Sequence, residues 1–201
     1  MITLLLPFLF LFSACTTTEP LFSNSESQQS IDEFPENWSV TGRISVLNGE
    51  ENWYAKFSWI QNKQDFQLSF TGPLGETELQ VSQIAGNVLL KTPAKEVTGQ
   101  ELEQLLHQET GWELPVVSLR YWMRAHPNST MVSELKYNKN EQISDIFQAG
   151  WHIQYPKRMT AEQLSGLKII LPKKIIATKK DIKVKLIITR WNLGDSALNL
   201  K

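Results

Sequence analysis

The sequence predicts a mainly β protein, in which a curved antiparallel sheet forms a half-open barrel covered by two or three short helices. Apolar and polar residues alternate over most of the chain between Trp38 and Trp191, and short turns separate the alternating stretches. Two stretches near the middle have helical periodicity instead. A sheet of roughly nine to eleven strands curls because its strands twist, and its concave side can then hold the helices.

Five consecutive strands are expected in the first half of this region, and their short connections predict an antiparallel meander. The alternating stretches are residues 38–46, 53–59, 66–71, 77–82 and 88–90. Turn-forming residues separate them, including Asn48-Gly49 and Gly86-Asn87. Later strands are expected at residues 143–147, 151–155, 167–171 and 182–191. Ala149-Gly150 predicts a hairpin between the first two of these later strands.

Two amphipathic helices are expected between the two groups of strands. Thr98 and Glu101 have the spacing of a capping box, and Gly111 is placed to end the first helix. The second helix is expected to begin at Pro115 and to end before Pro127. Both helices have one apolar side, which must cover another part of the protein.

An apolar residue stands at the tip of the turn between the third and fourth strands. Pro73 and Gly75 favour a tight reversal, and Leu74 lies between them. Turn tips usually carry polar residues, because they meet water. Leu74 either folds back onto its own hairpin or faces an apolar partner such as a membrane.

The first residues of the chain have the pattern of a bacterial lipoprotein signal. Residues 1–14 are almost wholly apolar and end in Ser13-Ala14, directly before Cys15. Fourteen residues are too few to span a bilayer, which needs about 20. Cys15 is the only cysteine, so we expect it to carry a covalent diacylglycerol and an N-acyl chain; the alternative is a buried or free cysteine in an ordinary exported protein. No Lys or Arg precedes the apolar run, which leaves the true start codon open.

The rest of the chain divides into a tether and one domain. Residues 15–36 are rich in Ser, Asn, Glu and Gln without apolar periodicity, which predicts a flexible tether. Residues 37–201 are expected to form a single β domain. Residues 151–201 hold 11 Lys and Arg but 3 Asp and Glu, although the whole chain has a net charge of −1. This basic region is either a solvated sheet face or a surface that attracts anionic headgroups or an acidic partner.

The sequence contains none of the motifs that would support an enzyme. Its three histidines, His107, His126 and His152, are expected on different elements, without metal-ligand spacing or a cysteine beside them. No G-x-S-x-G elbow, P-loop or G-x-G-x-x-G motif is present. We therefore expect no catalytic site, no metal and no cofactor other than the lipid on Cys15. Nucleic acid is not an expected partner for an exported lipoprotein.

Several short motifs occur in a specific order after Cys15 and the tether. They are WYAKFSWIQ at residues 53–61, GPLGETEL at 72–79, GNV at 86–88, GWELP at 111–115 and SLRYW at 118–122. Together they resemble the LolB family of outer-membrane lipoprotein receptors, over about residues 38–191. One departure is Ala125, where the family often has glycine.

The resemblance implies a curved sheet closed by helices around an apolar cavity. It implies that the protein accepts lipoproteins from the periplasmic carrier LolA and inserts them into the inner leaflet of the outer membrane, as a lipid-anchored monomer facing the periplasm. With no nucleotide-binding motif, transfer would follow affinity alone. The 73–75 turn would be the membrane insertion loop. Candidate acyl-chain residues are Phe57, Trp59, Phe70, Leu79, Leu105, Trp122, Met123 and Ile188; the alternative for each is an ordinary core position.

Two other functional classes stay open at this point. The protein could be a structural or scaffold lipoprotein of envelope assembly, with a packed core that binds no ligand. A lipid hydrolase is the weaker alternative, because the sequence offers no nucleophile arrangement. Binding of a fluorescent apolar ligand would separate an acceptor from a scaffold.

Overall fold

The computed structural model describes residues 34–111 and 113–194, which belong to one compact unit, Ile31–Lys201. Cys15 and most of the expected tether lie outside the described residues. Within the described ranges, no helix is long and apolar enough to cross a membrane. The elements are β1 (Asn37–Asn48), β2 (Glu51–Asn62), β3 (Asp65–Thr71), β4 (Thr77–Ile84), β5 (Asn87–Lys91), β6 (Glu96–Gly99), α1 (Leu102–Thr110), α2 (Val116–Trp122), β7 (Ser133–Tyr137), β8 (Ile143–Gln148), β9 (Trp151–Glu162), β10 (Lys168–Lys179) and β11 (Ile182–Leu193).

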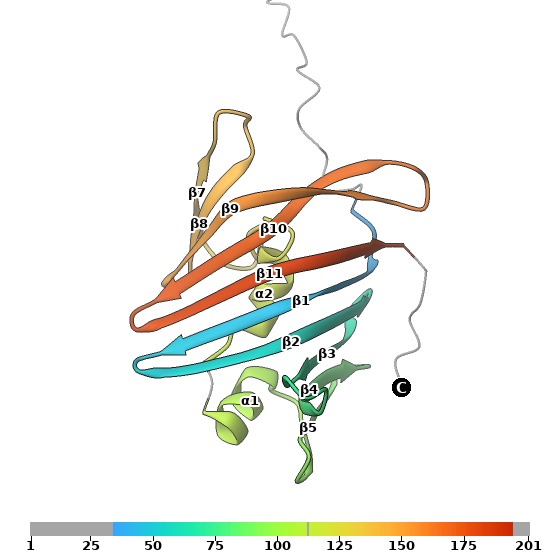
Figure 1. The fold of residues 1–201 in the computed structure, drawn as a ribbon, viewed down its shortest axis with the longest axis vertical. Helices are drawn as coiled ribbons and strands as arrows, with labels where there is room; N and C mark the ends of the chain where they lie inside the picture. Colours follow the sequence, from blue (N-terminus) through green and yellow to red (C-terminus); the bar gives the residue numbers. More distant parts are fainter. Residues whose placement is uncertain (1–33, 112, 195–201) are drawn as a thin grey trace, which may run out of the picture. The chain divides into compact units, whose positions relative to one another are not determined.

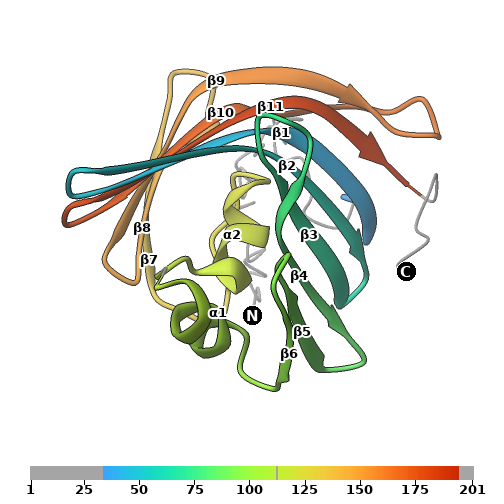
Figure 2. The ribbon, with the colours of Figure 1, turned by 60° about the horizontal axis from the view of Figure 1, so that its bottom comes forward.

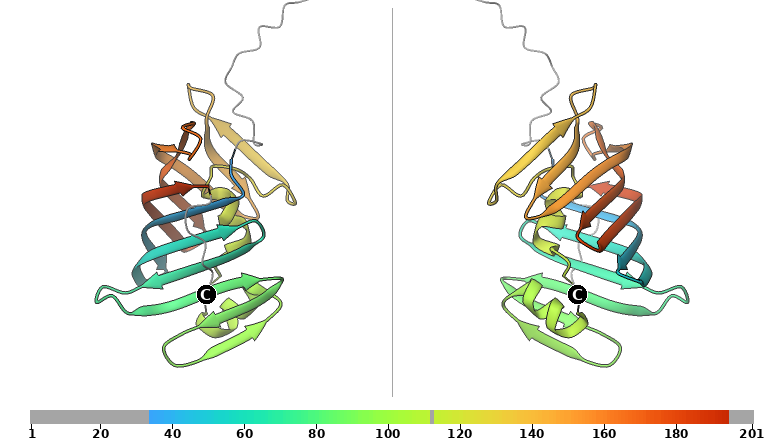
Figure 3. Two further views of the ribbon diagram at one scale, coloured as in Figure 1. Left: turned by 90° about the vertical axis from the view of Figure 1, so that its right-hand side faces the viewer. Right: turned by 90° about the vertical axis from the view of Figure 1, so that its left-hand side faces the viewer.

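All the strands belong to one antiparallel sheet of 11 strands, in the order β6-β5-β4-β3-β2-β1-β11-β10-β9-β8-β7. The first and last strands pair in its middle, and β6 and β7 are its edges. The sheet curves, and α1 and α2 lie inside the curve (Figures 1 and 2). In side view, β4–β6 and α1 lie at one end of this unit and β7–β9 at the other (Figure 3). The predicted mainly β, half-open architecture is confirmed.

Two hairpin turns form near their predicted positions for a clear conformational reason, although the turn expected at Gly86-Asn87 lies one residue earlier because Asn87 already pairs in β5. Ala85 and Gly86 have φ angles of 50° and 81°, and Ala149 and Gly150 have 51° and 78°. Two successive residues with positive φ make the turn whose twist matches that of the paired strands. These turns hold β4–β5 and β8–β9 in register. Along each strand, every second side chain then points toward the concave face, as in β3.

The predicted helix boundaries are partly wrong. Thr98 lies in β6, paired with Leu89, so it cannot cap α1. Glu101 is the N-cap instead, without a side-chain capping bond. Sheet pairing at the edge therefore overrides the local capping signal. Gly111 ends α1 as predicted, in the left-handed conformation with φ 73°.

The second helix begins after Pro115 as expected but ends at Trp122, well before Pro127. Ala125 has a φ of 56°, in the left-handed region where glycine is most easily accommodated. A residue in this conformation cannot continue an α-helix, so the chain turns away at this point.

Four strands differ from the prediction. The short edge strands β6 and β7 were not expected, and β9 and β10 continue beyond the residues assigned to them. β9 contains Pro156 and β10 contains Pro172. The β9–β10 pairing shifts in register next to Pro172. Because a proline lacks an N–H, such an irregularity lets a strand continue through it.

An aromatic cluster fills the end of the concave face where β1 begins. Trp38 stacks on Trp59, with ring centroids 6.0 Å apart, and lies 5.5 Å from the ring of Trp191. Trp59 also packs against Phe66 at 5.3 Å. All four side chains are buried. This end of the barrel is therefore closed by packing.

Candidate functional site

A groove with an apolar floor and a partly polar rim lies at the other end of the concave face, between the long central strands and the α1–α2 connection. Its volume is about 560 Å³, within the usual range for ligand sites. Trp53, Val46 and Val184 form one row across β2, β1 and β11 and make its floor. The remaining lining residues are Asn48, Glu51, Asn52, Thr110, Gly111, Glu113, Leu114 and Ile182.

The groove exists because the central hairpins are longer than their neighbours. The pairing of β2 with β3 begins at Lys56 and Thr71, so residues 51–55 extend beyond β3. Above this extension, Gly111 ends α1 and turns the chain toward Leu114. The projecting strands thus provide an apolar floor, and the helix connection covers it only in part.

Trp53 connects the groove to Phe70, which lies in the row beyond Ala55 on the concave face. Its ring packs edge-on against Phe70, with centroids 5.3 Å apart. Its indole Nε1 donates a 2.9 Å hydrogen bond to Oε2 of Glu78. Glu78 lies in β4 directly after the turn that carries Leu74. A hydrogen bond therefore joins the groove to the base of that turn.

Four predicted cavity residues form a single row, which is separated from the groove floor by the row of Ile44, Ala55 and Leu186. Ile188, Phe57, Phe70 and Leu79 follow one another in register across β11, β2, β3 and β4, with Gly42 of β1 between the first two. A Cβ atom on Gly42 would lie 2.8 Å from the Phe57 ring and 2.3 Å from the Ile187 carbonyl oxygen. A glycine at this position therefore allows the Phe57 ring to lie over the sheet.

The other four predicted cavity residues are dispersed. Trp59 lies one row further toward the aromatic cluster, Leu105 lies on α1, and Trp122 and Met123 lie at the end of α2. All eight are buried, and none of them lines the groove. Their contact with a bound chain stays a prediction.

Sequence reasoning did not identify the residues that line the groove. Val46 and Trp53 were placed on the correct face, but alternation does not distinguish a filled part of that face from an open one. The available signal was strand length: the 12-residue strands β1 and β2 had to extend beyond the 7-residue β3.

A buried polar network fixes α2 to the sheet. Trp122 Nε1 donates to Oε1 of Gln148 at 2.9 Å, and the backbone N–H of Asn128 donates to the same oxygen at 2.9 Å. The Tyr155 hydroxyl donates to the backbone oxygen of Trp122 at 2.8 Å. Burial raises the pKa of Tyr155 well above its ordinary value, so this donor stays protonated. Gln148, on the inward face of β8, was not anticipated.

The polar contacts that hold α1 lie nearer the surface. Oε1 of Glu103 accepts a 3.3 Å hydrogen bond from the backbone N–H of Val117, which joins α1 to α2. Partial desolvation at this junction raises the pKa of Glu103. Lys95, in the β5–β6 loop, forms an ion pair with Glu109. Lys95 is exposed, and exposed pairs contribute about 0–1 kcal/mol, so the burial of Leu102, Leu105 and Leu106 is the main attachment of α1.

The turn that carries Leu74 projects from the sheet. Gly72 N–H donates to the Glu76 carbonyl oxygen at 2.9 Å, and Gly75 N–H donates to the Gly72 carbonyl oxygen at 3.1 Å. Gly75 has a φ of 94°, which favours glycine. These bonds close the turn and leave the Leu74 side chain 95% exposed. Leu74 therefore does not fold back onto its own hairpin.

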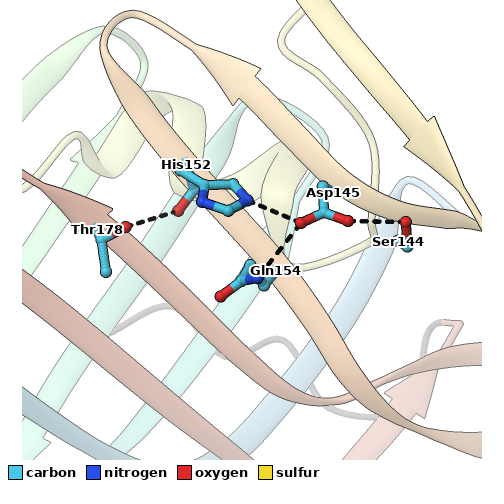
Figure 4. Close-up of polar contacts among 5 residues, drawn as sticks. All are labelled: Ser144, Asp145, His152, Gln154 and Thr178. Carbon is cyan, nitrogen blue, oxygen red and sulfur yellow. Dashed lines mark hydrogen bonds and ion pairs between the residues drawn. The ribbon is translucent and has the colours of Figure 1, made fainter.

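One histidine–aspartate cluster lies on β8 and β9, away from the groove (Figure 4). His152 Nε2 and Asp145 Oδ1 are 2.7 Å apart, and the Ser144 hydroxyl donates to Asp145 Oδ2 at 2.8 Å. Ser144 thus contacts the carboxylate rather than the imidazole, which is not a nucleophile–base arrangement. In residues 34–111 and 113–194, no group of three His, Cys, Asp or Glu is placed to hold a metal ion.

A family model described as "Outer membrane lipoprotein LolB" matches residues 36–191. Outer-membrane lipoprotein LolB of Cellvibrio japonicus is 31% identical over 160 residues, which cover 79% of this chain and 78% of that protein. The protein of the same name from Marinomonas sp. is 32% identical over 195 residues, covering 94% and 96%. A crystal structure of a LolA superfamily protein from Nitrosomonas europaea shares the fold, with a TM-score of 0.51, 12% identity and coverage of 81% and 88%.

Proposed function

The chain belongs to the LolB family of outer-membrane lipoproteins, and on that premise we propose that it accepts lipoproteins from a LolA-like periplasmic carrier and inserts them into the outer membrane. The observation that carries this proposal is the groove, which has an apolar floor of Trp53, Val46 and Val184 and an incomplete cover. A lipoprotein in water needs such a shelter, because each exposed methylene costs about 0.8 kcal/mol.

The groove is proposed as the opening of a larger acyl-chain site. Moving α1 away from the sheet would extend the apolar surface from Trp53 to Phe70 and the rest of its row, with Leu105 on the moving side. The unequal attachment of the helices supports this idea. Both helices bury apolar side chains, but α2 is also held by buried hydrogen bonds, whereas the polar contacts of α1 are the Glu103 hydrogen bond and the Lys95–Glu109 ion pair.

Leu74 is proposed as the tip that enters the membrane during release. Its side chain is exposed, and its turn is closed by backbone hydrogen bonds, so it can meet a bilayer without unfolding the hairpin. The hydrogen bond between Trp53 and Glu78 couples the base of this turn to the groove. No step requires nucleotide hydrolysis if the membrane holds the acyl chains more tightly than the groove does.

Anchoring is proposed to occur through Cys15. A diacylglycerol and an N-acyl chain on this residue, followed by a tether over residues 15–36, would keep the folded domain at the periplasmic face of the outer membrane. Two or more acyl chains anchor a protein stably, whereas one gives reversible binding. The domain is proposed to work as a monomer.

The deciding experiment mixes the purified, anchored protein with lipoprotein bound to its periplasmic carrier. Transfer of the lipoprotein to this protein, and then into vesicles without ATP, is the expected result. Failure of transfer by the folded protein would remove the proposal. Binding of a fluorescent fatty acid, measured separately, distinguishes a groove that holds acyl chains from a scaffold with a packed core.

A further inference from the structure

The outer, convex face of the sheet carries a row of cations. Lys157, Lys174, Arg43 and Lys56 follow one another in register across β9, β10, β1 and β2, with Ile187 of β11 between Lys174 and Arg43. We call these four side chains the basic row. Their strands run side by side through the middle of the sheet (Figure 1). Neighbouring strands lie about 4.8 Å apart, so the four charges lie within roughly 20 Å of one another.

The basic row places like charges directly opposite each other twice. Arg43 lies opposite Lys56, and Lys174 lies opposite Lys157. Like charges in this position destabilise a sheet. Among the described residues, none of the four forms an ion pair that would relieve the repulsion. Because this arrangement of like charges destabilises the sheet, it indicates that the surface serves binding and not folding.

The neighbouring positions extend the same charge. In the next two rows toward the β1–β2 turn, the convex positions of β10, β11, β1 and β2 include Lys185 and Lys183 and no Asp or Glu. The whole chain nevertheless has a net charge of −1. Attraction of an anionic surface would therefore come from this face and not from the total charge.

We propose that the basic row is a docking surface for the anionic headgroups of a phospholipid membrane. Lys56, at one end of the row, lies opposite Thr71, the last residue of β3 before the turn that carries Leu74. The basic row thus ends next to the hairpin that carries the exposed apolar tip. Tyr54, 62% exposed, lies on the same face one row away, and tyrosine favours a membrane–water boundary.

A membrane accounts for both kinds of side chain on this surface. Cations attract its headgroups, and an apolar tip enters below them. An acidic protein would match the charges but would leave Leu74 and Tyr54 exposed without a role. The inference extends the proposed function by adding a headgroup-binding face, and it rests on that function only for the role of Leu74.

The test measures binding to phosphatidylethanolamine vesicles with and without phosphatidylglycerol. The protein used in this test begins at residue 15 and carries Cys15→Ser, so that neither the apolar leader nor a lipid contributes to binding. Residues 1–30 lie outside the compact unit, so the described contacts are kept. Lys56→Glu places a carboxylate opposite Arg43 and replaces a like-charge pair with an opposite one, so the sheet should be at least as stable. Lys139→Glu, exposed in the β7–β8 turn, is the control with the same change in net charge.

The wild-type domain should bind vesicles that contain phosphatidylglycerol, and added salt should weaken this binding. Lys56→Glu should weaken it roughly 25-fold, because each unit of charge near the surface is worth about fivefold. Lys139→Glu should change it less than about twofold.

Two results of the binding measurement would overturn the inference. One is an equal loss of vesicle binding in both variants, which would show that binding depends on the total charge and not on the basic row. The other is full binding by Lys56→Glu with an unchanged unfolding midpoint, which would show that the basic row does not carry the contact with the membrane. Lipoprotein transfer that proceeds equally with and without phosphatidylglycerol would remove the docking surface and leave the acceptor function standing. Vesicle binding by a protein that transfers no lipoprotein would leave the docking surface standing and remove the acceptor function.

Discussion

The indole Nε1 of Trp122 donates a 2.9 Å hydrogen bond to the side-chain oxygen of Gln148, and this contact ties helix α2 to the sheet inside the core. The amide nitrogen of Gln148 donates to the carbonyl oxygen of Asn128 at 2.9 Å. A single glutamine therefore satisfies a side chain and a backbone segment that would otherwise be unpaired and buried. This makes α2 a fixed part of the barrel.

Replacing this glutamine should weaken the whole domain. Gln148→Leu leaves the Trp122 N–H and the Asn128 backbone groups buried without partners, at about 1–3 kcal/mol for each group. We expect the free energy of unfolding, measured in urea, to fall by roughly 3 kcal/mol or more. Gln108→Leu, at an exposed position of α1, is the control and should change it by less than about 0.5 kcal/mol. An equal effect of both changes would contradict the structural role of Gln148.

Alternation predicted the concave face of β1 to β5 but could not locate the groove. Phe57 and Trp53 belong to the same alternating stretch, yet one is packed into the core and the other lines open space. The difference depends on how far β2 extends beyond β3 and on where α1 ends, which are tertiary relationships. The edge strands β6 and β7 were missed because they are short and half-exposed. Leu74 was identified because an apolar residue at a turn tip is a local signal.

Acid should remove part of the stability through Asp145. Burial raises the pKa of this carboxyl, but hydrogen bonds from His152, Ser144 and Gln154 outweigh it and lower the pKa below its ordinary value of 3.8. The stabilisation is therefore complete above about pH 3.8 and is lost as the pH falls through the lower value of the folded state.

Asp145→Asn tests this sign directly. The variant should be less stable than wild type at pH 7, by about 1 kcal/mol or less, because His152 is partly exposed and the pair is screened. The difference in stability between wild type and Asp145→Asn should be smaller when urea unfolding is repeated below pH 3.8. Asp181→Asn, in the exposed β10–β11 turn, is the matched change and should give no such pH dependence. A difference for Asp145→Asn that grows in acid would refute the assignment.

A charge on the groove wall should weaken ligand binding without unfolding the domain. Ile182 lines the groove and is half-buried, so Ile182→Glu can keep its carboxylate hydrated at the groove edge. An acyl chain in the groove would then have to desolvate that charge. We expect the affinity for a fluorescent fatty acid, followed by titration, to fall about tenfold or more. Ile84→Glu, at the opposite end of the sheet, should leave the affinity unchanged; equal losses would place the ligand elsewhere.

Leu74→Glu should separate acceptance of a lipoprotein from its insertion. The side chain is 95% exposed and makes no core contact, so the variant should unfold at the wild-type urea concentration and should accept lipoprotein normally. Insertion into vesicles should slow about tenfold or more, because moving a charged carboxylate into the apolar part of the bilayer costs free energy, whereas a leucine enters it favourably. Val132→Glu is the matched control, since Val132 is equally exposed on the loop before β7. If Val132→Glu slows insertion as much as Leu74→Glu, the effect belongs to added negative charge and not to the tip. If neither slows it, the 73–75 turn has no part in release.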